Sequence, residues 1–188
     1  FSENFRGETI PSLEEVLIAA KDRIKLIVEL KPYADDSDSL AREVVRLIEK
    51  YDMVDDCYIQ SLNYDALKAV REANEDIKIG QIVIISAGDL SPLDVDFYTI
   101  EQTMLSNRLI RDIHSQDREV WVWTINGKKD AMDVLSYNID GIITDHPDMI
   151  KEIITINLDK KTWNIAPSSS RFSLYFNLRD RVFKMCKR

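Results

Sequence analysis

The alternation of short apolar segments with amphipathic segments is the feature that most restricts the fold of this chain. Apolar residues recur at helical spacing in one kind of segment, and β-branched residues dominate the other. We expect strands at 24–31, 57–61, 77–85, 95–99, 119–125 and 141–144, and helices at 13–21, 39–51, 64–73, 101–114, 128–137 and 148–156. Strands that alternate with helices form βα units, so the sequence predicts a parallel sheet in an α/β fold. Six such strands suit either a doubly wound sheet or most of a (β/α) barrel.

Local signals support two of the helix starts. Ser12 and Glu15 have the spacing of a capping box, and Asn63 is a good N-cap for the helix at 64–73. Only about nine residues separate the strands at 77–85 and 95–99, which is too few for a full crossover helix. We therefore expect a short or irregular connection there.

Composition excludes several classes of protein. The net charge of −8 argues against general nucleic-acid binding. The 45% hydrophobic content can form a sizeable core, yet no apolar run approaches the roughly 20 residues of a membrane span. Cys57 lies in an apolar run and is interpreted as a core residue, whereas Cys186 is near the carboxyl terminus. Their spacing does not indicate a redox compartment.

One stretch carries unusual charges for a buried strand. Glu29 and Lys31 end the strand at 24–31, and they share a face with Ile27 because alternate strand residues point the same way. An acid and a base at this position are costly unless they are paired or used. Two interpretations remain open: a salt bridge at a strand end, or a metal-binding carboxylate beside a phosphate-binding ammonium.

Polar residues also stand at the ends of other strands. They are Gln60–Ser61, Tyr98–Thr99, Trp123 with Asn126, and Thr144–Asp145. In a (β/α) barrel the active site lies at the carboxyl ends of the strands, so this repetition predicts a site at that edge. No glycine-rich phosphate fingerprint follows any strand, which weakens a dinucleotide-binding interpretation.

Several motifs together resemble the later portion of a glycerophosphodiester phosphodiesterase domain. They are 10–17 (IPSLEEVL), 28–31 (VELK), 60–61 (QS), 122–126 (VWTIN) and 140–147 (DGIITDHP), and they occur in the family's order over roughly residues 8–154. The resemblance implies a (β/α)₈ TIM barrel that hydrolyses glycerophosphodiesters to glycerol 3-phosphate and an alcohol. It also implies a divalent cation, Mg²⁺ or Ca²⁺, held by carboxylates.

The resemblance also assigns roles to residues of this chain. Glu29 matches a metal ligand, and Lys31 matches the lysine that neutralises phosphate charge. Trp123 matches the aromatic residue at the site, either as a wall for the substrate or as core packing. Gln60 and Asn126 are weaker candidates for substrate binding.

The sequence lacks three features of the family pattern. The family's His-Arg-Gly strand, its Glu-x-Asp strand and a second catalytic histidine are not found, and neither His114 nor His146 matches a catalytic histidine. The six strands would then be the third to eighth of an incomplete barrel. We therefore expect no catalytic residue in this chain, no activity of the isolated fragment, and completion of the barrel by an upstream piece, strand exchange or dimerisation.

Other functions are left open by the residues. The alternative to an enzyme is a non-catalytic barrel remnant that binds a phospho-ligand or a partner, and a weaker possibility is a phospholipase-type relative. The expected small-molecule partner is a glycerophosphodiester, with no nucleic acid. The location is unknown: membrane association through a missing amino-terminal region and a cytoplasmic location are both considered.

The carboxyl-terminal stretch differs in character from the rest. Residues 157–188 carry eight basic and two acidic residues, a net charge of +6, and aromatic residues alternate with the basic ones beyond a linker at 167–170. We divide the chain into a partial barrel domain at 1–156 and a basic aromatic extension at 157–188. Residues 171–188 are predicted either to contact an anionic membrane surface or to dock on the acidic barrel.

Overall fold

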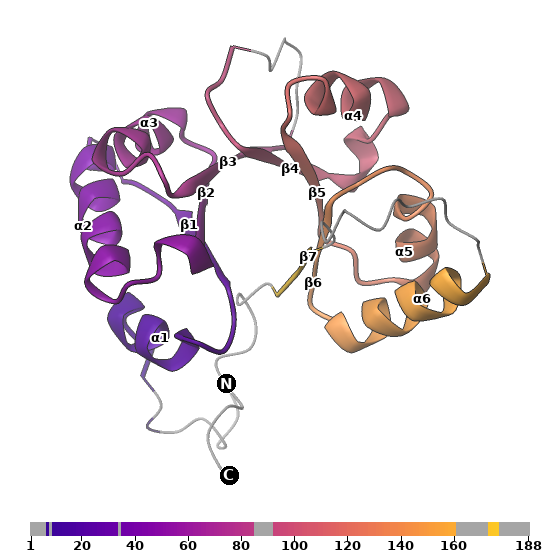
Figure 1. Ribbon diagram of the computed structural model, residues 1–188, viewed down its shortest axis with the longest axis horizontal. Coiled ribbons are helices and arrows are strands. Elements are labelled where there is room, and N and C mark those ends of the chain that lie inside the picture. Colours follow the sequence, from indigo (N-terminus) through magenta and orange to yellow (C-terminus); the bar gives the residue numbers. More distant parts are fainter. Residues whose placement is uncertain (1–6, 8, 34, 85–91, 161–172, 177–188) are drawn as a thin grey trace.

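The computed structural model shows one curled parallel sheet with helices along its outer side (Figure 1). It describes residues 7, 9–33, 35–84, 92–160 and 173–176. The strands are β1 (Leu26–Leu30), β2 (Cys57–Ser61), β3 (Lys78–Val83), β4 (Phe97–Glu101), β5 (Glu119–Trp123), β6 (Gly141–Thr144) and β7 (Ser173–Phe176). The α-helices are α1 (Leu13–Ala20), α2 (Ser37–Lys50), α3 (Tyr64–Ala73), α4 (Asn107–His114), α5 (Lys128–Val134) and α6 (Pro147–Lys160), and the short 3₁₀ helices are η2 (Val54–Asp56) and η3 (Gln102–Met104).

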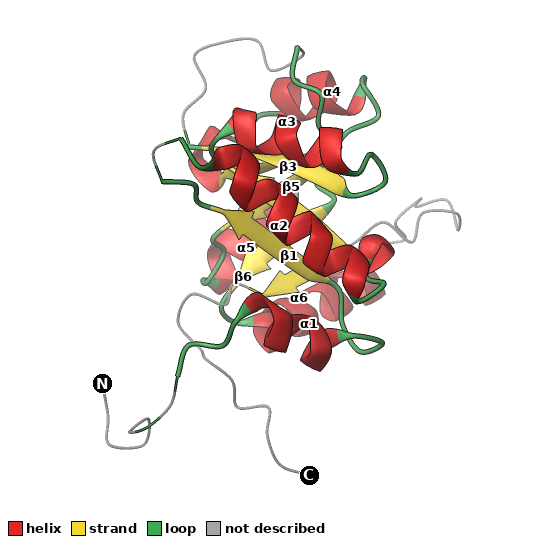
Figure 2. Ribbon diagram, turned by 90° about the vertical axis from the view of Figure 1, so that its left-hand side faces the viewer, coloured by secondary structure: helices red, strands yellow, loops and turns green. Residues whose placement is uncertain are grey.

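The strands follow one another in chain order, and each pair is parallel. The helices line the convex side of the sheet and leave the concave side to the strands, as the two views show (Figures 1 and 2). The predicted α/β fold with the strands of an incomplete (β/α)₈ barrel is therefore confirmed. A doubly wound sheet, which carries helices on both faces, does not fit this arrangement.

Alternate residues of each strand separate the core into two clusters. The larger cluster packs strand residues such as Ile59 and Ile100 against the helices. The smaller one, here called the concave cluster, consists of Phe97, Trp121 and Ile143, with Ile27, Tyr58 and Trp123 packed against it. Strand residues of the same parity as the concave cluster therefore face the interior of the curled sheet.

Both predicted helix starts are confirmed. Ser12 and Glu15 form a reciprocal capping box at α1, in which the Glu15 carboxylate accepts from the Ser12 N–H at 2.8 Å. The Asn63 side chain accepts a hydrogen bond from the Ala66 N–H at 3.2 Å and caps α3. These caps satisfy backbone donors that the first helical turn leaves without a partner.

Several predicted boundaries were wrong by a few residues. The largest error concerns the helix expected at 101–114, which is divided into η3 and α4. Ser106 interrupts it with an extended backbone, and its hydroxyl accepts from the Leu109 N–H at 3.2 Å. A serine hydroxyl can hydrogen-bond to the backbone, so serine favours a helix start over a helix interior. The apolar spacing alone did not indicate that a new helix starts after Ser106.

Strand β7 was missed by the sequence analysis. Residues 173–176 pair with β6, with Gly141 opposite Ser173 and Thr144 opposite Phe176. Part of the predicted extension at 157–188 therefore belongs to the sheet. The linker at 167–170 and most of the predicted membrane-contacting segment at 171–188 lie outside the described residues. Membrane contact, dimerisation and strand exchange stay predictions. Over the described ranges, no helix is both long and apolar enough to cross a membrane.

Cys57 and His114 both lie away from the carboxyl ends of the strands. Cys57 is 1% exposed, and burial raises the pKa of its thiol to about 12, so it is a core residue. His114 ends α4, and its Nε2 lies 2.8 Å from the Asp140 carboxylate. The same carboxylate accepts from the Val120 N–H at the start of β5, so His114 lies at the amino-terminal end of the strands.

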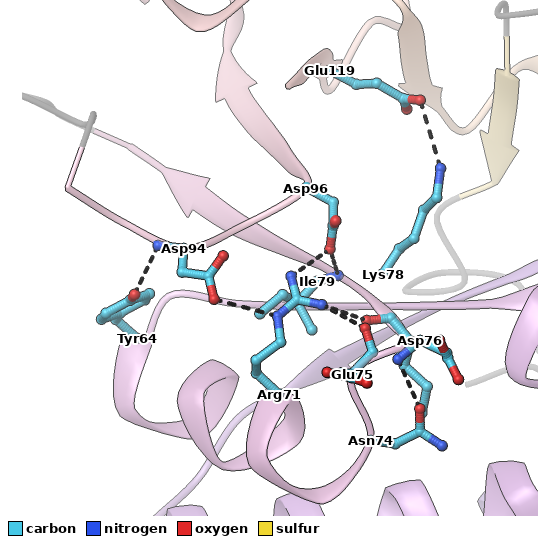
Figure 3. Close-up of polar contacts among 11 residues, drawn as sticks. Tyr64, Arg71, Asn74, Glu75, Asp76, Lys78, Ile79, Asp94, Asp96 and Glu119 are labelled. Atoms are coloured by element: carbon cyan, nitrogen blue, oxygen red, sulfur yellow. Dashed lines mark hydrogen bonds and ion pairs between the residues drawn. The ribbon is translucent and has the colours of Figure 1, made fainter. Parts of the chain in front are cut away.

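A polar cluster joins α3 to the amino-terminal ends of β3 and β4 (Figure 3). The Asp96 carboxylate accepts from Arg71 Nη2 and from the Ile79 N–H, each at 2.8 Å. Arg71 also donates to the Glu75 carbonyl at 2.9 Å. Since active sites of barrels lie at the opposite ends of the strands, we interpret this cluster as a contribution to stability.

Replacing Asp96 by alanine is expected to lower the free energy of unfolding by about 2 kcal/mol, because the N–H of fully buried Ile79 loses its acceptor. Urea denaturation measures this change. Asp94→Ala is the matched control, since Asp94 is 76% exposed and pairs with Arg71 only at 3.5 Å. It should change stability by no more than about 0.5 kcal/mol. Equal midpoints for the two variants would contradict the assignment.

Candidate active site at the carboxyl ends of the strands

Four of the five predicted site residues lie on the concave side at the carboxyl edge of the sheet. Glu29 and Lys31 follow Ile27 at alternate positions, Gln60 follows Tyr58, and Trp123 follows Trp121. Glu29 and Gln60 are direct partners across β1 and β2. Neighbouring strands are about 4.8 Å apart, so these two side chains stand side by side.

Glu29 and Lys31 form an ion pair. Lys31 Nζ lies 3.2 Å from Glu29 Oε2. The Lys31 side chain is 57% exposed, and the Glu29 side chain is 34% exposed. An ion pair this exposed contributes only about 0–1 kcal/mol to stability. The salt bridge predicted as one interpretation is therefore present, but its stability contribution is too small to explain the placement of both charges.

Two of the candidate residues carry buried polar atoms that have no hydrogen-bond partner among the described residues. Neither Gln60 Oε1 nor Trp123 Nε1 has a hydrogen-bond partner in the described part of the chain. Most buried polar atoms in native proteins are hydrogen-bonded, and the exceptions commonly occur where water, an ion or a ligand binds. Both atoms lie on the concave side and therefore support a binding role for this edge.

Asn126 is held in a local network at the same edge. Its Nδ2 donates to the Asp145 carboxylate at 2.7 Å, and its Oδ1 accepts from the Thr144 hydroxyl at 3.2 Å and the Asp145 N–H at 2.9 Å. The side chain thus joins the loop after β5 to the end of β6. We interpret Asn126 as a residue that positions this edge.

Three residues of the predicted polar edge, Ser61, Tyr98 and Thr144, face the helices instead. Ser61 is fully buried, donates to the Leu30 carbonyl at 2.8 Å and accepts from the Asn63 N–H. Tyr98 is 1% exposed in the larger core, and its hydroxyl accepts from Arg118 at 3.1 Å. Each directly neighbours a concave-facing residue, so alternation of the strand turns it away from the site.

Sequence reasoning omitted Glu101, and it named Thr99 with Tyr98 at the polar edge without assigning it a role in binding. Both share the parity of Phe97 in β4, and Glu101 is the direct partner of Trp123. The half-buried Glu101 carboxylate accepts from the Thr103 N–H at 2.9 Å and also from the Thr103 hydroxyl. Period-two alternation could have separated Thr99 from Tyr98 and added Glu101, but the strand was expected at 95–99, which ends before Glu101.

The described residues do not form a complete metal site. No group of three or more His, Cys, Asp or Glu side chains that could hold a metal lies within them. Mg²⁺ is commonly held by one or two carboxylates with waters and substrate phosphate, so Glu29 suits one position around it. Ca²⁺ takes about six to eight oxygen ligands, which Glu29 alone does not approach.

Comparison with known proteins identifies the family. Residues 1–149 match the model of the Glycerophosphoryl diester phosphodiesterase family, and the chain belongs to this family. It is 29% identical to YhdW of Bacillus subtilis, provisionally named a glycerophosphodiester phosphodiesterase, over 78% of this chain and 63% of that protein. It is 25% identical to the glycerophosphodiester phosphodiesterase of Caldanaerobacter subterraneus over 82% of this chain and 65% of that protein.

A solved structure supports the fold. A phosphodiesterase from Oleispira antarctica superposes with a TM-score of 0.71 at 24% identity, over 78% of this chain and 62% of that one. This chain therefore spans less than two thirds of the length of the relatives described here.

Proposed function

We propose that this chain carries one side of a phosphodiesterase site that hydrolyses glycerophosphodiesters to glycerol 3-phosphate and an alcohol. Membership of the family supports this, and the similar Oleispira antarctica enzyme was solved with the product sn-glycerol-3-phosphate. The observation that carries the proposal is the exposed Glu29–Lys31 pair at the carboxyl edge of the concave side. Beside it stands Gln60, whose side-chain oxygen has no hydrogen-bond partner within the described ranges.

The side chains divide the work by their chemistry. The Lys31 ammonium, a compact point charge with more than half of its surface exposed, balances charge on the phosphate. Trp123 borders the substrate on the concave side of the sheet. Gln60 accepts a hydrogen bond from the substrate. Asn126 holds the loop after β5 in place.

A divalent cation is part of the proposal, with Glu29 as one of its ligands. Such an ion, when bound, polarises a phosphoryl oxygen and offsets developing negative charge. Mg²⁺ suits the single carboxylate better than Ca²⁺ does. The family's His-Arg-Gly and Glu-x-Asp motifs do not occur in this sequence. We therefore propose that the 188-residue chain alone has no detectable turnover.

Two observations favour a second candidate, a barrel that binds a phospho-ligand without hydrolysing it. No group of three metal-ligating side chains lies in the described ranges, and Glu29 already has Lys31 as a partner. Under this alternative, glycerol 3-phosphate binds through Lys31 but no diester is cleaved.

Hydrolysis of glycerophosphocholine and glycerophosphoethanolamine tests the proposal. The full-length gene product and the 188-residue chain are assayed with Mg²⁺, with Ca²⁺ and with a chelator, and released glycerol 3-phosphate is measured. We expect metal-dependent release by the full-length product and none by the chain. No turnover with either metal by a folded full-length product, together with retained glycerol 3-phosphate binding, would establish the binding function instead.

A further inference from the structure

One fully buried polar side chain on the concave side has no part in the functions above. Thr99, in the middle of β4, is 0% exposed, and its hydroxyl has no hydrogen-bond partner among the described residues. Its direct partners across the sheet are Ile82 and Trp121, which carry apolar surface. A buried hydroxyl in such surroundings is costly unless a further group pairs with it.

The buried atoms without partners are concentrated on this side of the sheet. Of five such atoms in the described ranges, three belong to Gln60, Thr99 and Trp123. The other two lie elsewhere: Gln81 faces the helix side, and Arg71 Nε is 3.5 Å from the Asp94 carboxylate. The concave side therefore holds a carbonyl acceptor, a hydroxyl and an indole donor that have no hydrogen-bond partner in the described part of the chain.

The chemistry of these three atoms limits what they can bind. The Gln60 oxygen only accepts, the Trp123 nitrogen only donates, and the Thr99 hydroxyl does both. An anion would not use the acceptor, and a cation would not use the indole donor. A polyol matches all three, because each of its hydroxyl groups donates and accepts.

We propose that Thr99, together with Gln60 and Trp123, binds the hydroxyl groups of the glycerol moiety, directly or through one buried water. This inference rests on the proposed function and adds Thr99 as a residue that selects substrates with free hydroxyl groups. Lys31 contacts the phosphate end of the same ligand, and Thr99 lies deeper in the sheet.

Thr99→Val tests the assignment because valine keeps the shape and removes the hydroxyl. Affinities for glycerol 3-phosphate and for n-propyl phosphate, which has no hydroxyl groups, are measured by calorimetry with the full-length gene product and Mg²⁺. We expect Thr99→Val to weaken glycerol 3-phosphate binding about tenfold and to leave propyl phosphate binding unchanged. Thr99→Ser should retain most of the affinity for glycerol 3-phosphate.

The melting temperature of the free protein supplies a second readout. If the Thr99 hydroxyl is unpaired until a ligand binds, valine should leave the melting temperature unchanged or raise it. A lower melting temperature with unchanged affinity would assign the hydroxyl to a structural water and overturn the inference. Equal losses for both phosphates would also overturn it. Failure of the unsubstituted protein to bind glycerol 3-phosphate would contradict the proposed function itself, and the inference with it.

Discussion

Replacing Glu29 by glutamine is expected to lower the rate of glycerophosphodiester hydrolysis about 10³-fold in an active protein that contains this chain. A carboxylate ligand helps to hold the cation, and the cation stabilises the transition state by several kcal/mol. Each ~1.4 kcal/mol corresponds to a factor of ten in rate. Glutamine has nearly the same size but no charge. The loss should appear in kcat at saturating Mg²⁺, measured as release of glycerol 3-phosphate from glycerophosphocholine.

The chain offers a closely matched control for this variant. Glu119 also lies in a strand beside a lysine, with its carboxylate 4.0 Å from Lys78 Nζ and 28% of its side chain exposed (Figure 3). It stands at the first residue of β5, at the amino-terminal end of the sheet. Glu119→Gln should therefore retain hydrolysis. Similar losses in both variants would show that net charge, and not the position of Glu29, determines the rate.

Stability of the Glu29 variant separates a chemical effect from unfolding. The Glu29–Lys31 pair is exposed, so its loss should change the free energy of unfolding by no more than about 0.5 kcal/mol. A folded Glu29→Gln protein with unimpaired hydrolysis would remove Glu29 from the proposed metal site.

The order of the first six strands and of the helices followed from the sequence because each of these elements is either periodic or a short continuous apolar run. The apolar spacing of α2 indicates a helix, and the alternation of buried and half-buried residues in β2 indicates a strand. Errors arose where a polar side chain decided the boundary, as Ser106 does between η3 and α4. Strand β7 was missed because its four residues lie among basic and polar residues, and its pairing with β6 depends on contacts distant in sequence.

The candidate site was predicted less completely than the fold. Glu29 and Lys31 stood out because charges at the end of an apolar strand are unusual. Ser61 and Tyr98 were included wrongly, because proximity to a strand end does not determine which face a residue occupies. Thr99 could not be distinguished from Tyr98 until the register placed it beside Trp121. An unpartnered hydroxyl is visible only in three dimensions.

Gly80→Ala is expected to lower the free energy of unfolding by about 3 kcal/mol, although alanine usually stabilises a strand relative to glycine. Gly80 is the direct partner of Phe97 on the concave side, and a Cβ atom placed on it would overlap the Phe97 ring. That ring cannot readily move. It is 1% exposed, stacks on Trp121 with centroids 4.2 Å apart, and meets Tyr58 edge-on at 5.9 Å.

A second substitution distinguishes overlap from other causes. Phe97→Leu removes the ring, so Gly80→Ala should cost much less in a Phe97→Leu background than in the unsubstituted protein. Gly127→Ala is the control for glycine replacement itself. Its Cβ would meet only the Asp130 side chain, with Oδ2 at 2.8 Å, and this exposed side chain can rotate away, so a loss of no more than about 1 kcal/mol is expected. Additive losses for Gly80 and Phe97 in urea denaturation would contradict the packing argument, because residues in contact should couple and independent ones should not.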